Sequence, residues 1–142
     1  MSFIASLVKF FTLAILIAAS AASASAAELI MFEQAGCAWC EAFDREIGPI
    51  YAKTDEGKRA PLRRLDIASD LPSDLRFLTV ERLTPLFILV DKGREIGRIR
   101  GYTGEDHFWG LLASLLKRLD TESNDRAWLL QKPLHAGNRC PV

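Results

Sequence analysis

Cys37 and Cys40 are separated by two residues and are the side chains in this sequence best suited to chemistry. Such a pair can alternate between a dithiol and an intramolecular disulfide, exchanging electrons with another protein. The preceding residues 28–33 (ELIMFE) have the pattern of a short strand, and Ala35-Gly36 that of a turn. We therefore expect a helix to begin at Cys37, where free N–H groups and the positive end of the helix dipole favour a thiolate.

This position predicts different roles for the two thiols. Cys37, at the start of the helix, is expected to be the exposed nucleophile. Cys40 would lie one turn further in, where it can close the intramolecular disulfide and release a covalently bound partner.

Other uses of the pair remain open. A structural disulfide here would close a very small loop and stabilise little. A copper(I) chaperone is a second alternative, with His107 or His135 beside the two soft thiolates. A four-ligand zinc site is disfavoured because the sequence lacks a second C-x-x-C or a nearby H-x-x-H. A non-catalytic peptide-binding module is the last alternative.

The first 26 residues have the three-part pattern of a secretory signal peptide. Lys9 supplies a positive charge, residues 10–19 are almost purely apolar, and residues 20–27 are small, with Ala24-Ser25-Ala26 as the cleavage site. An uncleaved anchor is the alternative, but the apolar core of about ten residues is short for a span of about twenty. Export would place the protein in an oxidising compartment, the periplasm. Of three cysteines, Cys140 is then left over, as an inert thiol or a regulatory mixed disulfide.

Composition limits the remaining choices. The 142 residues are 49% hydrophobic, with 18 basic and 18 acidic side chains, as expected of one modest globular domain. This balance gives no reason to expect nucleic acid as a partner. We divide the chain into a signal peptide (1–26), a domain (27–119) and a C-terminal extension (120–142), with no stable membrane insertion after cleavage.

The elements expected in the domain alternate between strands and helices. We predict strands at 28–33, 61–67, 86–90 and 94–102, and helices from 37, over 73–82 and from 105 to 119, with a break at Gly48-Pro49. The apolar run 86–90 is typical of a strand covered on both faces. A tight turn at 91–93 would lead into an edge strand protected by arginines. Residues 55–59 are expected to be a polar exit with Gly57 as a stop signal, and Thr103 the N-cap of the last helix. Residues 128–130 would form a short docking turn or part of a tail.

With Cys37-Ala38-Trp39-Cys40 followed about 45 residues later by Thr84-Pro85, the chain resembles the thioredoxin superfamily over roughly residues 28–119. The resemblance implies an α/β thioredoxin-like fold, in its minimal β-α-β-α-β-β-α form with a central mixed sheet, and thiol–disulfide oxidoreductase activity. The signal peptide and residues 101–109 (GYTGEDHFW) are similar to a periplasmic branch found with bacterial sulfur-oxidation systems, the SoxS or SoxW type.

The resemblance also implies site residues. Cys37 and Cys40 would be catalytic, and Trp39, Thr84 and Pro85 would bind the substrate. Pro85 would be cis, lie against the cysteine pair and shape the groove beside Cys37, while the Thr84 backbone would hydrogen-bond an extended client segment. An ordinary trans proline at a strand start is the alternative.

Three departures from the family pattern limit this transfer. Gly36 stands where thioredoxins have tryptophan, Ala38-Trp39 replaces Gly-Pro, and Met31 occupies the position of the family's buried acid. Deprotonation of Cys40 would then need another group. Glu33 and Glu41 are the candidates, and solvated surface acids are the alternative interpretation.

The predicted function is reduction of a partner protein's disulfide, oxidised cysteine or persulfide carrier, without a bound cofactor or metal. Electrons would come from an upstream membrane or soluble redox protein. We favour reduction over oxidation because Ala38-Trp39 has no histidine between the cysteines to over-stabilise the thiolate.

Overall fold

The computed structural model describes residues 27–131, in which a mixed sheet forms the centre. Its four strands run in the order β2-β1-β3-β4, with bounds β1 Glu28–Glu33, β2 Leu62–Asp66, β3 Leu86–Asp91 and β4 Arg94–Arg100. β1 is parallel to β2 and antiparallel to β3, which is antiparallel to β4. All six residues of β3 are buried, so the predicted central strand is confirmed, as is the central mixed sheet.

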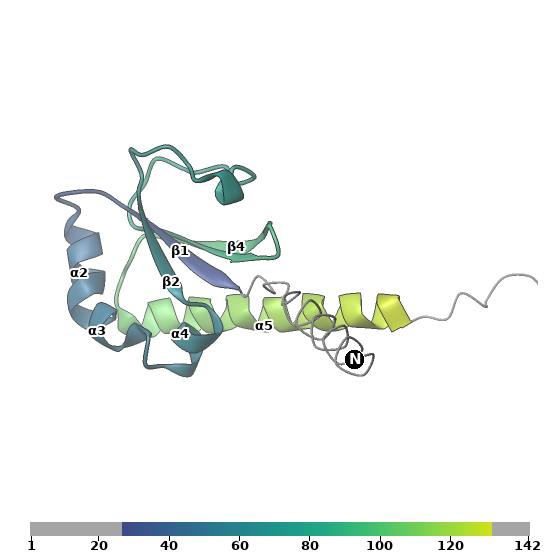
Figure 1. The fold of residues 1–142 in the computed structure, drawn as a ribbon. Coiled ribbons are helices and arrows are strands. Elements are labelled where there is room, and N and C mark those ends of the chain that lie inside the picture. Colours follow the sequence, from purple (N-terminus) through teal and green to yellow (C-terminus); the bar gives the residue numbers. More distant parts are fainter. Residues whose placement is uncertain (1–26, 132–142) are drawn as a thin grey trace, which may run out of the picture.

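Helices cover one face of this sheet and an irregular segment covers the other (Figure 1). The helices are α2 (Ala38–Glu46), α3 (Gly48–Tyr51), α4 (Asp55–Arg59) and α5 (Glu105–Gln131). Leu29 and Met31 of β1 point to the helix side, into a core that includes Phe43. Ile30 and Phe32 point to the opposite core, because successive side chains of a strand alternate between faces. The break expected at Gly48-Pro49 occurs one residue earlier, at Ile47, and Gly48 and Pro49 begin α3.

The helix predicted over residues 73–82 is wrong. Only a short 3-10 helix forms there, η1 (Ser73–Leu75), and the chain is then irregular up to β3. Leu75 and Leu78 are both buried, which a single turn achieves because the Leu78 N–H donates to the Leu75 carbonyl at 2.9 Å. Leu83 packs against the same core from the irregular chain. The apolar spacing therefore reflected burial of one loop face and not a helical period.

Residues 55–59 also differ from the expected polar exit, because they form α4. Thr54 is its N-cap, accepting a hydrogen bond from the Gly57 N–H at 3.0 Å. Gly57 lies inside this helix and is buried, so it does not act as a stop signal.

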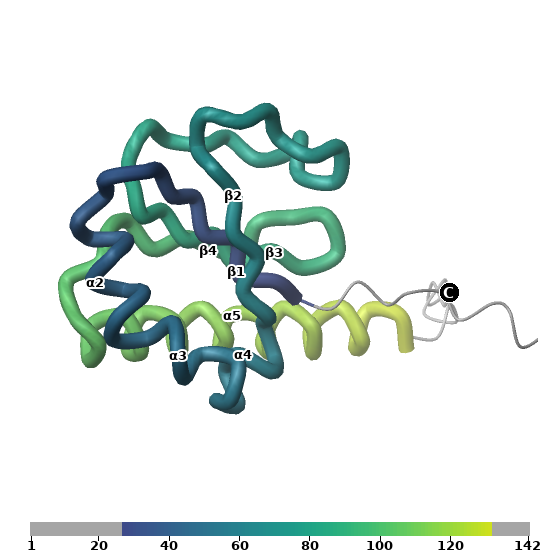
Figure 2. The backbone as a smooth tube through the Cα atoms, turned by 60° about the vertical axis from the view of Figure 1, so that its left-hand side comes forward, coloured from purple at the N-terminus to yellow at the C-terminus, as the bar shows by residue number. Residues whose placement is uncertain are grey.

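α5 is longer than predicted and begins one residue later than its expected cap implies. The Phe108 N–H donates to the carbonyl of Gly104, which therefore occupies the N-cap position instead of Thr103. The boundary expected at residue 119 falls inside α5, which continues through the exposed residues 128–130 and extends past the sheet (Figures 1 and 2).

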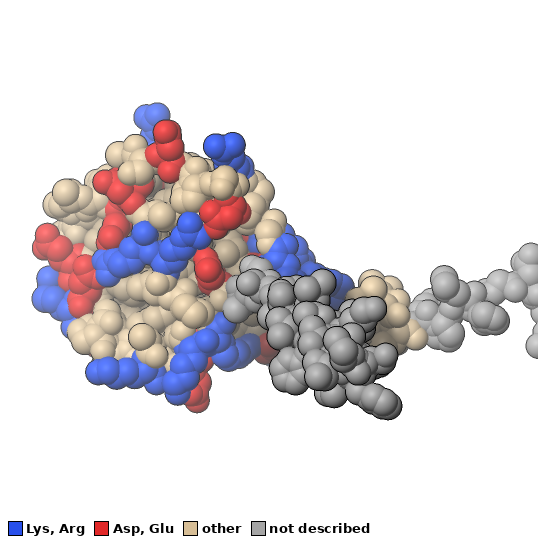
Figure 3. Space-filling model, viewed as in Figure 1, with Lys and Arg blue, Asp and Glu red and all other residues tan. Residues whose placement is uncertain are grey.

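Several expectations concern residues outside this description. The predicted signal peptide (1–26), His135 and Cys140 all lie outside the described residues. Within residues 27–131, no helix is long and apolar enough to cross a membrane. Acidic and basic side chains are interleaved over the face seen in Figure 3.

Candidate active site

The predicted redox pair lies where β1 turns into α2. Gly36 occupies this turn with φ +73°, in the left-handed region that glycine adopts without a steric penalty. Cys37 follows in extended conformation and is the N-cap of α2. Its Sγ accepts a hydrogen bond from the backbone N–H of Cys40 at 3.1 Å. The strand, turn and helix expected around the pair are thus confirmed.

Cys37 and Cys40 are joined in a disulfide, with Cα atoms 5.2 Å apart. Cys37 is 7% exposed and Cys40 4% exposed, so the expectation that Cys37 would be exposed is wrong for this disulfide form. The Cys37 sulfur is bonded to Cys40 and accepts from the Cys40 N–H in the first turn of α2, which accounts for this low exposure. Trp39, between them, is 60% exposed.

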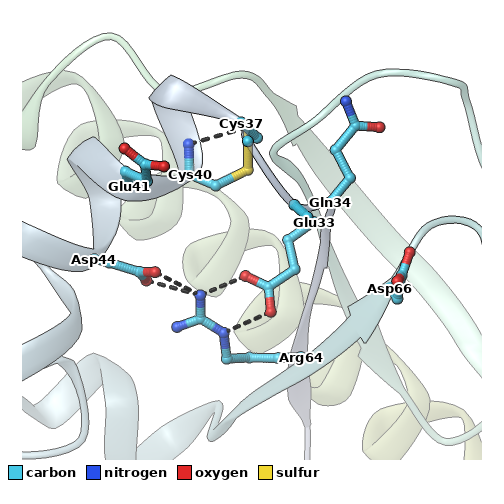
Figure 4. A pocket seen from close by; sticks show the side chains of 10 residues that line it. Glu33, Gln34, Cys37, Cys40, Glu41, Asp44, Arg64 and Asp66 are labelled. Atoms are coloured by element: carbon cyan, nitrogen blue, oxygen red, sulfur yellow. Dashed lines mark hydrogen bonds and ion pairs between the residues drawn. A yellow bond between two sulfur atoms is a disulfide. The ribbon is translucent and has the colours of Figure 1, made fainter.

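A polar cavity of about 390 Å³ opens beside the disulfide (Figure 4). Both cysteines contribute to its wall, together with the end of β1, the start of α2 and the end of β2. Arg64 of β2 lies between Glu33 of β1 and Asp44 of α2. Its guanidinium donates to both oxygens of Glu33, in one case from Nε at 3.0 Å, and to Asp44 Oδ2 at 3.0 Å. The hydrogen bond to Glu33 is the main reason why the pKa of Arg64 is raised above its usual value.

The wall of this cavity is predominantly acidic. Its charged residues are Glu33, Glu41, Asp44 and Asp66, with Arg64 as the counter-charge. Arg64 pairs with both Glu33 and Asp44. Glu41 has no ion-pair partner among residues 27–131. Negative charge near a thiolate raises the pKa of the thiol, whereas the start of α2 lowers it.

Thr84 and Pro85 lie at the same end of the central strands β1 and β3 as the cysteine pair. Phe32, one residue before the end of β1, pairs with Leu86, the first residue of β3. Pro85 immediately precedes Leu86, and Cys37 follows shortly after Phe32. The chain before β3 and the chain after β1 therefore meet at this end of the strands. The peptide bond between Thr84 and Pro85 is cis, the isomer that the family resemblance implies. Pro85 is buried and Thr84 is half-buried.

The position of the family's buried acid is apolar here. Met31 is fully buried on the helix side of β1 and pairs in register with Arg64 of β2. Glu33 is half-buried and bound to Arg64, so it is not a free surface acid. Arg64 was not among the predicted site residues, because the sequence around it indicates only a strand.

The copper(I) alternative needed a histidine near the pair. His107 lies in the first turn of α5 and borders a different hollow, formed by residues 103–107. In the described part of the chain, no group of three or more potential metal-ligating side chains occurs.

A solved structure matches this arrangement. The crystal structure of the periplasmic thioredoxin SoxS from Paracoccus pantotrophus, in its reduced form, is 45% identical, with a TM-score of 0.60 over 66% of this chain and 98% of that one. The chain belongs to the thioredoxin superfamily. It is of the SoxS-like type, and its cysteine pair and fold make it a thiol–disulfide oxidoreductase.

The other comparisons add little to this assignment. The thioredoxin of Malassezia sympodialis, Mala s 13, is 21% identical, with a TM-score of 0.47 over 66% of this chain and 76% of that one. No family model matches the chain, and neither does any curated protein.

Proposed function

We propose that this thioredoxin-like protein is a periplasmic reductase of a client protein's disulfide or oxidised cysteine. Cys37 attacks the client disulfide, so that a Cys37–client disulfide forms and the client's other sulfur leaves as a thiolate. Cys40 then attacks Cys37, which forms the intramolecular disulfide and releases the client as a dithiol. An upstream redox protein supplies two electrons to restore the Cys37/Cys40 dithiol.

The acidic wall beside the disulfide is the observation that supports the proposed direction of electron flow. A strong oxidant of this superfamily works by stabilising its thiolate, which makes its dithiol form favourable. Four carboxylates against one guanidinium oppose such stabilisation here. Ala38-Trp39 also lacks a histidine that would assist it. The disulfide form is thereby favoured, and a protein that favours its own disulfide donates electrons.

The client-contacting residues are Trp39, Thr84 and Pro85. Trp39 offers an exposed apolar surface beside the cysteine pair. The half-buried Thr84 can offer backbone groups to an extended client segment, in the manner of strand addition. The periplasmic location is supported by the signal-peptide pattern of residues 1–26 and by the location in the name of the similar SoxS protein. Within sulfur oxidation, a fitting client is a carrier cysteine that must be returned to its thiol form.

The reduction potential tests this proposal. We expect equilibration with dithiothreitol to give a value near that of thioredoxin, about −270 mV, and far from the about −120 mV of a strong oxidant. Glu41→Gln should shift the potential in the oxidising direction because it removes an unpaired negative charge near the thiolate.

Asp120→Asn is the matched control. It removes a carboxylate that pairs with Arg59 at 2.5 Å and does not border the cysteine cavity, so it should leave the potential unchanged. A wild-type reduction potential of about −120 mV, the value of a strong oxidant, would contradict the reductase assignment.

A further inference from the structure

The irregular chain between η1 and β3 ends in the proposed client-binding residues, and it has few hydrogen bonds of its own. Between residues 76 and 85 the backbone forms no regular element. The Leu83 N–H donates to the Glu81 carbonyl at 2.9 Å, and the Gly101 N–H donates to the Pro85 carbonyl at 2.8 Å. Besides the packing of Leu83 against the core, side-chain contacts therefore contribute to fixing the approach of this chain to Thr84.

Glu81 supplies a rigid connection to the edge strand β4. Its Oε1 accepts from Arg98 Nη1 at 2.7 Å and from Arg100 Nη2 at 2.6 Å, and its Oε2 accepts from Arg100 Nε at 2.7 Å. The fork from Arg100 uses both carboxylate oxygens, a geometry that fixes orientation as well as distance. The hydrogen bonds from Arg100 are the main reason why the pKa of Glu81 is lowered to about 2, so the carboxylate is charged throughout the neutral range.

Arg98 is itself held in place by contacts other than Glu81. Arg98 and Arg100 are two residues apart on β4 and so share one face of it. The Arg98 side chain is only 15% exposed, and it also binds Glu95 and donates to the Thr79 carbonyl at 3.1 Å. β4 therefore presents two guanidinium groups to Glu81, of which Arg98 is fixed by Glu95 and the Thr79 carbonyl, while Arg100 is 57% exposed and pairs with Glu81 itself.

Thr84 lies between two residues that are bound to β4 or to the residue that follows it. Glu81 is held by the arginines of β4, and Pro85 is held by Gly101, the residue that follows β4. Only residues 82–84 span the interval. We propose that Glu81, through Arg98 and Arg100, is a positioning residue that sets the Thr84–Pro85 backbone for protein clients. This inference rests on the proposed function, in which the Thr84 backbone pairs with an extended client.

A kinetic comparison of two substrates tests it in the full-length protein. Insulin presents a disulfide within a peptide segment, whereas 5,5′-dithiobis(2-nitrobenzoate) is a small disulfide that does not need the Thr84 backbone. We expect Glu81→Ala to raise KM for insulin at least fivefold with kcat nearly unchanged, and to leave the small-disulfide rate within twofold. Arg100→Gln removes two of the three hydrogen bonds to Glu81 and should act in the same way. Glu81→Gln keeps an acceptor and should have an intermediate effect.

Asp74→Ala is the matched control, in η1 at the start of the irregular chain that leads to β3. Asp74 in η1 binds Arg63 Nη1 at 2.6 Å, which is the same carboxylate–arginine chemistry at a distance in sequence from Pro85. It should leave both rates unchanged. An equal loss with both substrates in Glu81→Ala, or an insulin-specific loss in Asp74→Ala, would overturn the positioning role.

Amide hydrogen exchange tests the positioning without depending on turnover. The Gly101 N–H reports on its bond to the Pro85 carbonyl, so Glu81→Ala should speed its exchange about fivefold, while amides of the central strand β3 keep their wild-type rates. Unchanged Gly101 exchange would overturn the inference. Faster exchange in a protein whose wild type reduces neither substrate would support the positioning role and contradict the proposed reductase function instead.

Discussion

Gly57→Ala should destabilise the protein strongly, although glycine normally weakens a helix. Gly57 is buried within α4, where an added Cβ would lie 1.9 Å from the Tyr51 carbonyl oxygen and 2.7 Å from its carbon. That oxygen already accepts hydrogen bonds from the Thr54 N–H at 3.1 Å and the Thr54 hydroxyl at 2.8 Å. The backbone of Tyr51 must therefore move, and both bonds to Thr54 are strained.

The magnitude follows from these two consequences. Overpacking costs about 1–3 kcal/mol and each weakened hydrogen bond roughly 0.5–1.5 kcal/mol, so we expect the free energy of unfolding to fall by about 3 kcal/mol. In a domain of this size that corresponds to a decrease in Tm of roughly 10–20 °C. Urea unfolding followed by circular dichroism measures the free energy directly.

Gly110→Ala is the matched control in α5. Nothing lies within 4 Å of a Cβ at Gly110, so this variant should be more stable than wild type by roughly 0.5–1 kcal/mol because alanine is the better helix former. A Gly57→Ala variant as stable as wild type would refute the close contact between α4 and Tyr51.

Three further predictions concern other parts of the fold. Gly36→Ala should lower the free energy of unfolding by about 1–2 kcal/mol, measured by urea unfolding, because alanine is strained at φ +73° even though its Cβ meets no atom within 4 Å. Tyr51→Phe should cost about 1 kcal/mol in the same assay, because it removes a buried 2.7 Å hydrogen bond from the Tyr51 hydroxyl to the Ala60 carbonyl. The pKa of Glu81 is lowered from 4.5 to about 2 in the folded state, so its contribution to stability is present above pH 4.5 and lost as pH falls toward 2. Unfolding measured across this range should show the difference between wild type and Glu81→Gln shrinking with acidification.

The sheet and the redox turn could be predicted because their signals are local. The apolar run at Leu86–Val90 and the turn at 91–93 require little knowledge of tertiary contacts, and Lys92 and Gly93 do adopt positive φ. The cysteine spacing likewise identified the disulfide that the structure contains.

The errors arise where tertiary contacts decide the local structure. Leu75 and Leu78 have helical spacing, but a single turn buries both against the sheet. Gly57 has the composition of a stop signal, yet its lack of a side chain serves close packing on Tyr51. The contacts of Arg64 with Glu33 and Asp44 join three separate elements, so no local pattern could reveal them. Cys37 is buried because the disulfide holds its sulfur against α2, which spacing alone does not indicate.

Trapping of the covalent intermediate in Cys40→Ser and Cys37→Ser tests the roles assigned to the two cysteines in disulfide reduction. Both variants should carry Cys140→Ser, so that Cys37 and Cys40 are the thiols compared. After incubation with a disulfide-bonded protein, Cys40→Ser should accumulate a mixed disulfide at Cys37, seen as an added mass that dithiothreitol removes. Cys37→Ser should show no such adduct and no turnover. Full disulfide-reductase activity in Cys37→Ser, or an adduct at Cys40 instead of Cys37, would contradict the assigned roles.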